Sequence, residues 1–495
     1  MLTEKKMQVG IANGFYSGFN RALEMSPEAV ISEISDSGLR GRGGAGFSTA
    51  TKWRACREAP GDEKFIITNG AEGDPEAKSI RMLLESDPYT VLEGMLIGAY
   101  AIGAGRGILF LNRNHPEGID RVRSALRQAE ALGLTGDNIL GSGFSFRIEI
   151  FEGTNDFVCG VETALIRALE GERPMPRIRP PYPAISGLNG KPTCVNSAET
   201  LAHVSAILQK GAAWYRGFGT DKSLGTKLLT LTGPVADPGV IEVEMGTTLR
   251  RIIEEMGGGV SGGRELKAVL IGGPTGGFLP NSALDLPLDF ESLSAAGAVM
   301  GSGRITVIDT DTCMVALARD CLSFSKHESC GKCAFCREGS AQLFSILTDI
   351  TTGKGQSNDI DLLEELCEGM RTGSICGLGQ TAPNPVLTLL KYFREELEAH
   401  LKKKRCPALV CRKFITFHIL GEKCGGCGRC KERCPEEAIA GDEGMIHVID
   451  AEACMKCGVC LEICPAEYSA VIKAGGVKPR TPAEPVPVGS WRKRP

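Results

Sequence analysis

Two cysteine runs of the same form lie near the C-terminus of this chain of 495 residues. Each has the pattern C-x-x-C-x-x-C-x-x-x-C-P, ending at Pro435 in the first run and at Pro465 in the second. This spacing wraps three thiolates around a cubane cluster, and the fourth cysteine ligates the cluster of the other run. Zinc, which takes two pairs of ligands, and disulfides are the weaker alternatives. We therefore expect two [4Fe–4S] clusters, one on Cys424, Cys427, Cys430 and Cys464, and one on Cys454, Cys457, Cys460 and Cys434.

Composition and charge narrow the class of protein. With 42% hydrophobic and 23% charged residues and a net charge of −4, the chain is typical of globular proteins and shows no nucleic-acid or membrane footprint. No apolar run reaches the length of a membrane span, and Met1–Lys6 lacks the apolar core of a signal peptide. Twenty cysteines without an export signal indicate a reducing cytoplasm, and exposed cubanes favour an anaerobic host.

Hydrophobic periodicity predicts several domains. Strands over 64–69, 107–112 and 145–151 alternate with helices over 26–36, 91–104 and 116–132, which indicates an α/β domain. A ubiquitin-like β-β-α-β unit follows, with strands over 228–234, 239–243 and 268–272 and a helix over 248–256. Helices over 312–324, 337–350, 361–370 and 384–403 predict a four-helix bundle. The expected domains are 1–215 (α/β), 216–305 (ubiquitin-like), 306–405 (bundle), 406–473 (two clusters) and 474–495 (an extended, exposed tail).

A third cluster motif lies within the expected bundle. Cys330, Cys333 and Cys336 have x-x spacing and lead into a helix, which favours a third [4Fe–4S] cluster over a zinc site. Cys376, in the loop before the last helix, is the expected fourth ligand. Cys367 is spaced as a core residue of its helix and is the weaker candidate.

The glycine-rich loop Gly41–Phe47 contains G-x-G-x-x-G, but it follows a helix, whereas the dinucleotide fingerprint follows a strand. The ordinary Rossmann interpretation therefore fails. The backbone amides of such a loop can still approach a phosphate or a flat ring, with Arg42 and Lys52 as nearby cations. A purely structural turn is the alternative.

Seven motifs along the chain carry a resemblance to a known family. They are the loop with Lys52-Trp53, and the segments 69–75, 159–165, 179–183, 195–200, 328–333 and 377–383. In this order they resemble the FMN- and NADH-binding (51-kDa) subunit of respiratory complex I, and the match covers residues 10–470. The appended double cubane resembles the form in cytosolic NAD-linked hydrogenases and electron-bifurcating complexes.

The resemblance implies a Rossmann-like flavin domain, a ubiquitin-like (SLBB-type) insert, a cluster-bearing four-helix bundle and a 2[4Fe–4S] ferredoxin domain. It implies FMN and NAD(H) as ligands. FMN would contact Gly41, Arg42, Gly43, Gly44, Lys52, Asn69, Gly160, Asn196 and Ser197. The nucleotide would contact Phe47, Glu72, Asp74, Glu162, Arg179 and Tyr182. The implied partners are a small thioredoxin-like [2Fe–2S] subunit, a larger catalytic or electron-accepting subunit, and ferredoxin.

Several residues depart from the family pattern. Ala71 stands where the family usually has aspartate and Val161 where it has glutamate, so two carboxylates near the flavin are missing. Their loss either weakens flavin binding or retunes its potential. Smaller departures are Ser197 for asparagine, Arg179 for lysine, Tyr182 for phenylalanine, and Ala55 where some members have an aromatic residue.

Cys406 and Cys411 lie between the bundle and the ferredoxin domain. Related hydrogenase subunits can carry zinc in this region, but the tail after Cys464 has neither His nor Cys, and the six histidines show no paired ligand spacing. We therefore expect two structural thiols here, with zinc as the alternative. Cys56, Cys159, Cys194, Cys313 and Cys321 are interpreted as packing residues.

Two main functional hypotheses follow, and a third keeps FMN but replaces NADH with NADPH, for which Arg179 is weak support. In the first, the chain is the NAD(P)H-oxidising flavin and iron–sulfur subunit of an electron-transfer complex, more specifically an electron-bifurcating one, using NADH rather than NADPH; FMN carries the hydride chemistry, so no side chain is expected to be catalytic. In the second, the flavin pocket has decayed and the chain is a non-catalytic conduit of clusters. Ala71 and Val161 favour the second, whereas the loop Gly41–Phe47, Lys52 and Asn69 favour the first.

Overall fold

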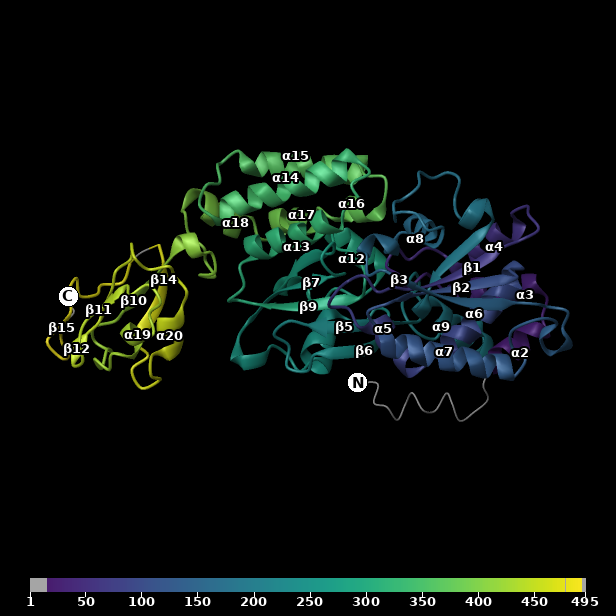
Figure 1. Ribbon diagram of the computed structural model, residues 1–495, viewed down its shortest axis with the longest axis horizontal. Coiled ribbons are helices and arrows are strands. Elements are labelled where there is room, and N and C mark those ends of the chain that lie inside the picture. The colour runs from purple at the N-terminus through teal and green to yellow at the C-terminus, as the bar shows by residue number, and fades with distance from the viewer. Residues whose placement is uncertain (1–15, 477, 492–495) are drawn as a thin grey trace. The chain divides into compact units, whose positions relative to one another are not determined.

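The computed structural model describes residues 16–476 and 478–491 (Figure 1), so the segment Met1–Lys6 lies outside the described residues. The chain forms two compact units. The first consists of Met1–Asp309, Cys321–Ala341 and Leu366–Thr388, and the second of Thr310–Asp320, Gln342–Glu365 and Leu389–Pro495.

The first unit begins with a four-stranded parallel sheet. Its strands are β1 (Phe65–Gly70), β2 (Arg106–Asn112), β3 (Arg147–Gly153) and β4 (Thr193–Ser197), in the order β3-β2-β1-β4. The chain leaves β1 for β2 on one side, whereas β4 lies on the other. The carboxyl ends of β1 and β4 therefore meet at a topological switch point, where open α/β sheets bind ligands.

Helices cover both faces of this sheet (Figure 1). On one face, α2 (Ser17–Leu23), α3 (Pro27–Asp36), α4 (Thr49–Glu58), α6 (Pro88–Ile102), α7 (Pro116–Ala131) and α9 (Ala198–Lys210) share a large apolar core that includes Ile66 of β1. On the other face, α8 (Glu162–Leu169) shares a smaller core with Phe65 and Ile67. Alternate residues of β1 thus enter opposite cores, as the strand period requires. The expected cap of α3 is present, since the Ser26 hydroxyl accepts from Ala29 N at 3.2 Å.

A five-stranded sheet follows in the same unit. Its strands are β5 (Thr226–Thr232), β6 (Gly239–Glu244), β7 (Leu266–Ile271), β8 (Gly277–Pro280) and β9 (Arg304–Asp309), in the order β6-β5-β9-β7-β8. The sequence prediction missed β8 and β9. β9 lies in the middle of the sheet, paired with β5 and β7, and such long-range pairing leaves no mark in the strand's own residues. The predicted helix is a short turn, α11 (Leu249–Arg251), that continues as a π-helix over Ile252–Met256.

The helical region comprises α13 (Met314–Glu328), α14 (Ala334–Thr351), α15 (Asp359–Gly373), α16 (Gly377–Thr381), α17 (Asn384–Tyr392) and α18 (Arg394–Lys402). The sequence predicted one last helix over 384–403. The structure divides it at Phe393, whose φ of −130° interrupts the helical backbone. After this break, α18 has its own set of buried residues, His400 among them.

The C-terminal part of the second unit carries the two cysteine runs. β10 (Ile415–Ile419) pairs with β14 (Val471–Gly475), β11 (Ile439–Ala440) with β13 (Val448–Ile449), and β12 (Met445–Ile446) with β15 (Val486–Pro487). Two short helices, α19 (Arg429–Glu432) and α20 (Val459–Ile463), end the runs. The tail was predicted to be extended and exposed, but part of it is packed. It contains β15, and Trp491 lies so close to Gly421 that a Cβ on Gly421 would be 2.7 Å from the indole.

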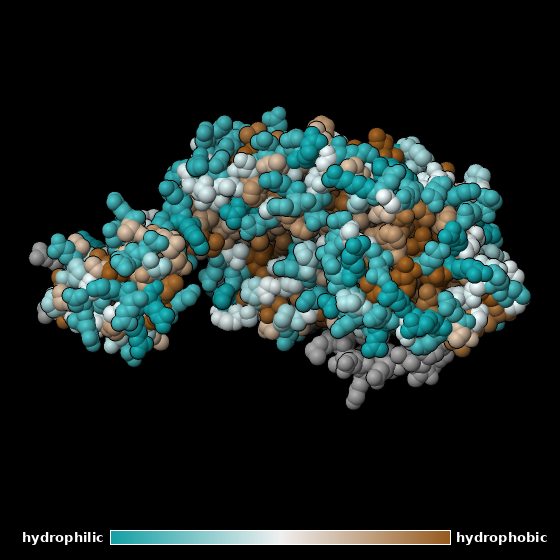
Figure 2. Space-filling model, in the orientation of Figure 1, coloured by the Kyte–Doolittle hydropathy of each residue, from teal (hydrophilic) through white to brown (hydrophobic). Residues whose placement is uncertain are grey.

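Within the described residues, we find no helix with both the length and the apolar character of a membrane span. The face drawn in Figure 2 carries hydrophilic residues with apolar patches between them.

Helices α6 and α9 of the flavin domain pack closely at Gly94. A Cβ at Gly94 of α6 would lie 1.9 Å from the backbone oxygen of Leu201 in α9, so Gly94→Ala must push these helices apart. We expect a loss of about 1–3 kcal/mol, as for other overpacked core sites, seen as a lower thermal midpoint. Gly105→Ala is the control, since no atom of the described chain lies within 4 Å of its would-be Cβ. Equal midpoints for the two variants would contradict this packing.

Candidate functional site

The crevice at the ends of β1 and β4 gathers residues predicted to bind flavin. Asn69 and Ser197 are register partners on the two strands. The Asn69 amide donates to the carbonyl of Cys159 at 3.2 Å and accepts from Ala71 N at 3.0 Å. The carbonyl oxygen of the Asn196 side chain accepts from the Trp53 indole at 3.0 Å. Both amides are thus held in fixed orientations at the switch point.

The glycine-rich loop lies against the same strand end. Arg42 N donates to the Thr200 hydroxyl at 2.9 Å, and a Cβ at Gly43 would lie 3.6 Å from Cβ of Ser197. Gly43 therefore leaves its backbone open beside the crevice, whereas Gly41 N already donates to the carbonyl of Phe47 within the loop at 2.8 Å. Gly44 has a different reason to be glycine: its φ is 112°, and a Cβ there would lie 2.7 Å from the carbonyl oxygen of Gly301.

The predicted role of Arg42 as a cation for a ligand is wrong. Its side chain is only 2% exposed. The guanidinium donates to the carbonyls of Thr226 and Arg40, both at 2.9 Å, and to the Tyr215 hydroxyl at 2.8 Å. These bonds join the flavin domain to β5, so Arg42 can serve a ligand only through its backbone.

Lys52 of α4 keeps its predicted place beside the crevice. Its ammonium donates to the carbonyl of Val195 at 2.9 Å and forms an ion pair with Glu162 at the start of α8. Burial lowers the pKa of Lys52, but the Glu162 carboxylate outweighs this effect and raises it above its usual value. Lys52 and Glu162 are therefore brought together as one charged pair, with both side chains partly exposed.

The residues predicted to bind nucleotide fall into two groups. Phe47 and Tyr182 are each 56% exposed, and the guanidinium of Arg179 lies 5.7 Å from the Tyr182 ring centre. Exposed rings of this kind are free to stack on a ligand. Gly160 likewise has no atom of the described chain within 4 Å of its would-be Cβ.

The two acids of the 69–75 motif serve the protein itself. The Glu72 carboxylate accepts from Ile80 N at 2.7 Å and Arg81 N at 2.9 Å, which caps α5 (Ser79–Ser86). Asp74 is buried, accepts from the Ser302 hydroxyl at 2.6 Å and lies 3.2 Å from the Arg304 guanidinium. Both carboxylates are therefore engaged by the protein itself, and their contacts with a nucleotide stay a prediction.

Ala71 and Val161, which replace the two carboxylates usual in the family, lie in different surroundings. Ala71 is buried in the smaller core with Ile67 and Cys159. Val161 packs against the apolar cluster that contains Cys336 and Cys376. The departure at Val161 therefore concerns the bundle cysteines as well as the flavin crevice.

The four cysteines predicted for the bundle cluster lie together in the first unit. Cys336 and Cys376 are buried with Val158, Ala164 and Leu378, and Cys330 and Cys333 pack against them. Burial raises the pKa of Cys336 to about 11, and the neighbouring Cys333, Cys376 and Cys330 add to the shift. Four thiols gathered in this way fit a site completed by a cationic cluster.

The ferredoxin domain contains two cavities, each lined by four cysteines. One is lined by Cys424, Cys427, Cys430 and Cys464, and the other by Cys434, Cys454, Cys457 and Cys460. Each cavity thus takes three cysteines from one run and the fourth from the other. This geometry fits a cubane in each cavity and agrees with the exchange expected from the spacing.

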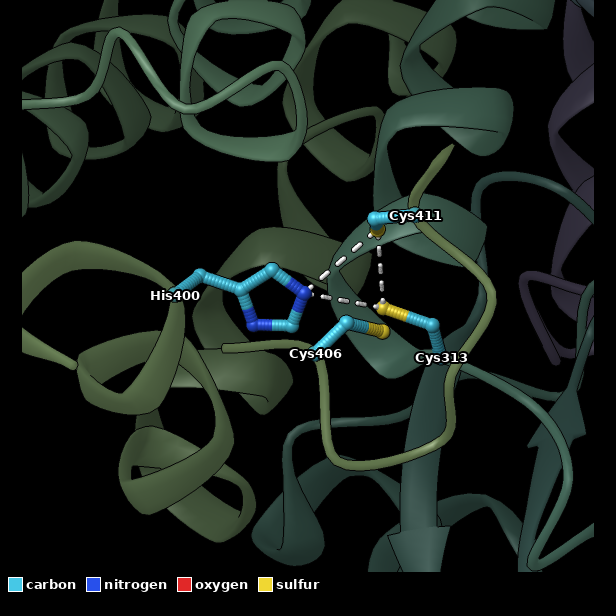
Figure 3. Close-up of side chains that lie close together, drawn as sticks. All are labelled: Cys313, His400, Cys406 and Cys411. Atoms are coloured by element: carbon cyan, nitrogen blue, oxygen red, sulfur yellow. Dashed lines mark hydrogen bonds between the residues drawn. The ribbon is translucent and has the colours of Figure 1, made fainter. Parts of the chain in front are cut away.

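A further group of metal-binding side chains lies in the second unit (Figure 3). Cys313 precedes α13, His400 lies on α18, and Cys406 and Cys411 lie in the segment that follows. All four residues are buried, and their ligand atoms lie within 4.8 Å of one another. Cys313, expected to be a packing residue, thus lies beside Cys406 and Cys411, and His400 joins this group although the histidines show no paired ligand spacing in the sequence.

The distances in this group fit a tetrahedral zinc ion. Cys313 Sγ lies 3.7 Å from Cys411 Sγ, and His400 Nε2 lies 3.4 Å from Cys313 Sγ and 3.5 Å from Cys411 Sγ. Ordinary zinc bond lengths place sulfur ligands about 3.8 Å apart, and sulfur and nitrogen about 3.6 Å apart. His400 Nδ1 donates to the carbonyl of Glu396 at 2.8 Å, which leaves Nε2 for a metal.

The three thiols of this group are close enough to change one another's ionisation. Hydrogen bonds among them lower the pKa of Cys406 and raise the pKa values of Cys313 and Cys411. The local signal in the sequence was His400 followed by Cys406 and Cys411. Cys313, which is 87 residues before His400, could not be found from spacing.

Comparisons with known proteins identify the family. Residues 34–206 match the Nuo51 FMN-binding domain, 228–279 the SLBB domain, 316–400 the NADH-ubiquinone oxidoreductase-F iron–sulfur binding region and 417–465 the 4Fe–4S dicluster domain. The chain is 48% identical over 432 residues to the NADP-reducing hydrogenase subunit HndC of Solidesulfovibrio fructosivorans, covering 87% of this chain and 88% of that one. The chain belongs to the 51-kDa FMN-binding family of complex I.

Further members of this family also match the chain over most of its length. A NADH-quinone oxidoreductase subunit of Rhizobium meliloti is 42% identical over 397 residues, covering 80% of this chain and 94% of that one. A solved NAD+-reducing [NiFe]-hydrogenase matches with a TM-score of 0.72 and 38% identity, over 79% of this chain and 66% of that chain, just under two thirds of its length. This confirms the family resemblance and the fold class expected from the sequence. As a member of the 51-kDa family, the chain is an oxidoreductase subunit.

The ligand set of the bundle cluster can be tested by substitution. We expect about 12 iron per chain in anaerobically purified protein, four for each of three clusters. Cys376→Ser should remove one cluster signal from the electron paramagnetic resonance spectrum. Cys367→Ser is the matched control, since Cys367 is another buried thiol and its spacing on α15 fits a core residue. Loss of the signal in the control instead would make Cys367 the fourth ligand.

Proposed function

We propose that this chain is the NAD(P)H-oxidising subunit of a multi-subunit, electron-bifurcating complex that works in the cytoplasm. Bound FMN would supply the conversion between a hydride and single electrons. The relatives support the coarser part of this proposal, because one is named for an NADP-reducing hydrogenase and another for an NADH-quinone oxidoreductase. We favour NADH, with a small [2Fe–2S] subunit and a larger electron-accepting subunit as partners.

One observation carries the proposal. The segment Phe157–Val161 contacts the flavin crevice and the bundle cysteines together, since Asn69 donates to the Cys159 carbonyl while Val158 and Val161 pack with Cys336 and Cys376. A flavin at the switch point and a cluster on these cysteines would therefore be separated by little more than this segment. Such closeness is what transfer of single electrons from flavin to cluster requires.

The chain's own residues would hold the ligands. The crevice is surrounded by the open backbone of Gly43, the amides of Asn69 and Asn196 and the Lys52–Glu162 pair. Phe47 and Tyr182 offer exposed rings to a nucleotide. Orientation and exclusion of water are the tasks left to the protein, because the redox chemistry belongs to the cofactors.

The conduit hypothesis is the second candidate, and it rests on Ala71. This buried alanine packs among apolar side chains where the family usually has a carboxylate, so one polar contact to a flavin is missing. A chain of this kind would carry clusters without flavin.

Flavin binding separates the two candidates. We expect acid treatment of the purified chain to release one FMN. Gly160→Ala should fold normally, because the added Cβ has open space, and should lose flavin if the crevice is occupied there. Gly43→Val should act in the same direction, since a larger side chain enters space beside Ser197. Gly105→Ala is the matched control. A cluster-loaded parent chain without flavin would establish the conduit.

We further propose that Cys313, His400, Cys406 and Cys411 hold a structural zinc ion. Four protein ligands leave no open position, which is the arrangement of structural rather than catalytic zinc. The ion would join the start of α13, the helix α18 and the segment 403–411 before the ferredoxin domain, all in the second unit.

Metal analysis tests this site. We expect about one zinc per chain by mass spectrometry, and its loss in His400→Ala and Cys406→Ser with iron content unchanged. Cys56→Ser is the control, since Cys56 is another buried thiol that lies in the first unit. A Cys313–Cys411 disulfide, or iron in place of zinc, would contradict the proposal.

A further inference from the structure

The two cavities of the ferredoxin domain are alike in their cysteines and different in their polar lining. Besides its four cysteines, the cavity lined by Cys434, Cys454, Cys457 and Cys460 includes the exposed carboxylate residue Glu436. The cavity lined by Cys424, Cys427, Cys430 and Cys464, which we name cavity A, includes His447 and Tyr468 instead. The two clusters of this domain would therefore meet different polar groups.

His447 is the unusual residue of cavity A. It lies between β12 and β13, and its side chain is only 1% exposed. Neither ring nitrogen meets ordinary hydrogen-bond geometry with any residue that the structure describes; a weaker contact with the Met445 backbone partly offsets the lowering of the imidazole pKa by burial and by Lys431. A buried polar group without a partner costs about 1–3 kcal/mol, and most such groups in native proteins have a partner.

The position of the ring is set by close packing. A Cβ at Gly441 would lie 3.1 Å from Cδ2 and 3.2 Å from Cγ of His447, so the glycine allows the ring to lie against the backbone. Lys431 fixes this backbone, because its ammonium donates to the carbonyl of Gly441 at 2.8 Å. The imidazole is thus held at the wall of cavity A by packing rather than by an ordinary hydrogen bond to any of the described residues.

We propose that His447 donates an N–H hydrogen bond to a sulfur of the cluster in cavity A and thereby gives that cluster a higher reduction potential than its neighbour. This inference rests on the three clusters of the proposed function. The ring carries at least one N–H whether neutral or protonated, so the bond does not depend on its titration. Hydrogen bonds to cluster sulfurs stabilise the reduced, more negative cluster.

Glu436, in the other cavity, increases the difference between the two reduction potentials. A carboxylate near a cluster disfavours added negative charge, which lowers the potential of that cluster. Electrons that enter the domain would therefore settle first on the cluster beside His447. The two clusters of the domain would therefore differ in reduction potential and would not be equivalent electron acceptors.

A redox titration of the full chain, followed by electron paramagnetic resonance, tests the inference. We expect two separate potentials for the ferredoxin clusters in the parent chain. His447→Leu should lower the higher potential and leave the other unchanged, because it removes the donor and keeps an apolar side chain. His447→Gln should retain most of the higher potential, since its amide still offers N–H. His418→Leu is the matched control: His418 lies in the same domain, bonded to the Thr416 hydroxyl at 2.7 Å, and lines neither cavity.

A second measurement detects the contact between the imidazole and the cluster directly. In parent protein labelled with 15N-histidine, pulsed resonance should show a nitrogen coupling to one reduced ferredoxin cluster, and the coupling should vanish in His447→Leu. Absence of this coupling in the parent, unchanged potentials in His447→Leu, or an equal fall in His447→Gln would each overturn the inference. Iron analysis separates this failure from failure of the proposed function: a parent chain with about four iron would lack the ferredoxin clusters altogether.

Discussion

The segment Phe157–Glu162 connects the parallel sheet of the first unit to the bundle cysteines, and the positions of both depend on its contacts. Phe157 N donates to the Glu328 carboxylate at 2.8 Å, just before the first bundle cysteine, and its ring meets Phe324 edge-on at 5.2 Å. Asn69 binds the Cys159 carbonyl, and Glu162 pairs with Lys52. One short stretch of backbone is thus held by the sheet on one side and by the cluster region on the other. Flavin crevice and cluster site are positioned by the same contacts, which suits a protein that moves electrons between them.

Several polar residues near the crevice serve this architecture rather than a ligand. The Arg42 guanidinium binds β5 and its neighbours, Glu72 caps α5, and Asp74 binds Arg304 at the start of β9. The side chain of a charged residue beside a binding motif can point toward a ligand or toward the protein. The sequence of the motif is the same in both cases, so it does not show which of the two occurs. The residues that remain open to a ligand are the small ones, Gly43 and Gly160, and the exposed rings of Phe47 and Tyr182.

Thiol chemistry organises the second unit in two ways. The ferredoxin cavities take their cysteines from loops, where x-x spacing suits a cubane. The group of Cys313, His400, Cys406 and Cys411 takes its members from a helix start, a helix and a connecting segment, where distances suit a tetrahedral ion. The same residue type would thus serve electron transfer in one place and, with a bound ion, cross-linking of the chain in the other.

The family was predicted from the resemblance of seven motifs to known members. Local patterns in the chain were enough to predict the exchange of cysteines between the two runs of the ferredoxin domain, because this exchange depends on spacing within short loops. They also placed most helices and strands, since apolar periods are local. The three-dimensional arrangement was needed to show that β9 lies in the middle of its sheet, that Arg42 faces inward and that Cys313 joins His400. It was also needed to find His447 at the wall of a cluster cavity, without an ordinary hydrogen bond to any of the described residues. These facts depend on which distant segments meet, and the residues of one segment do not record the orientation of its neighbours.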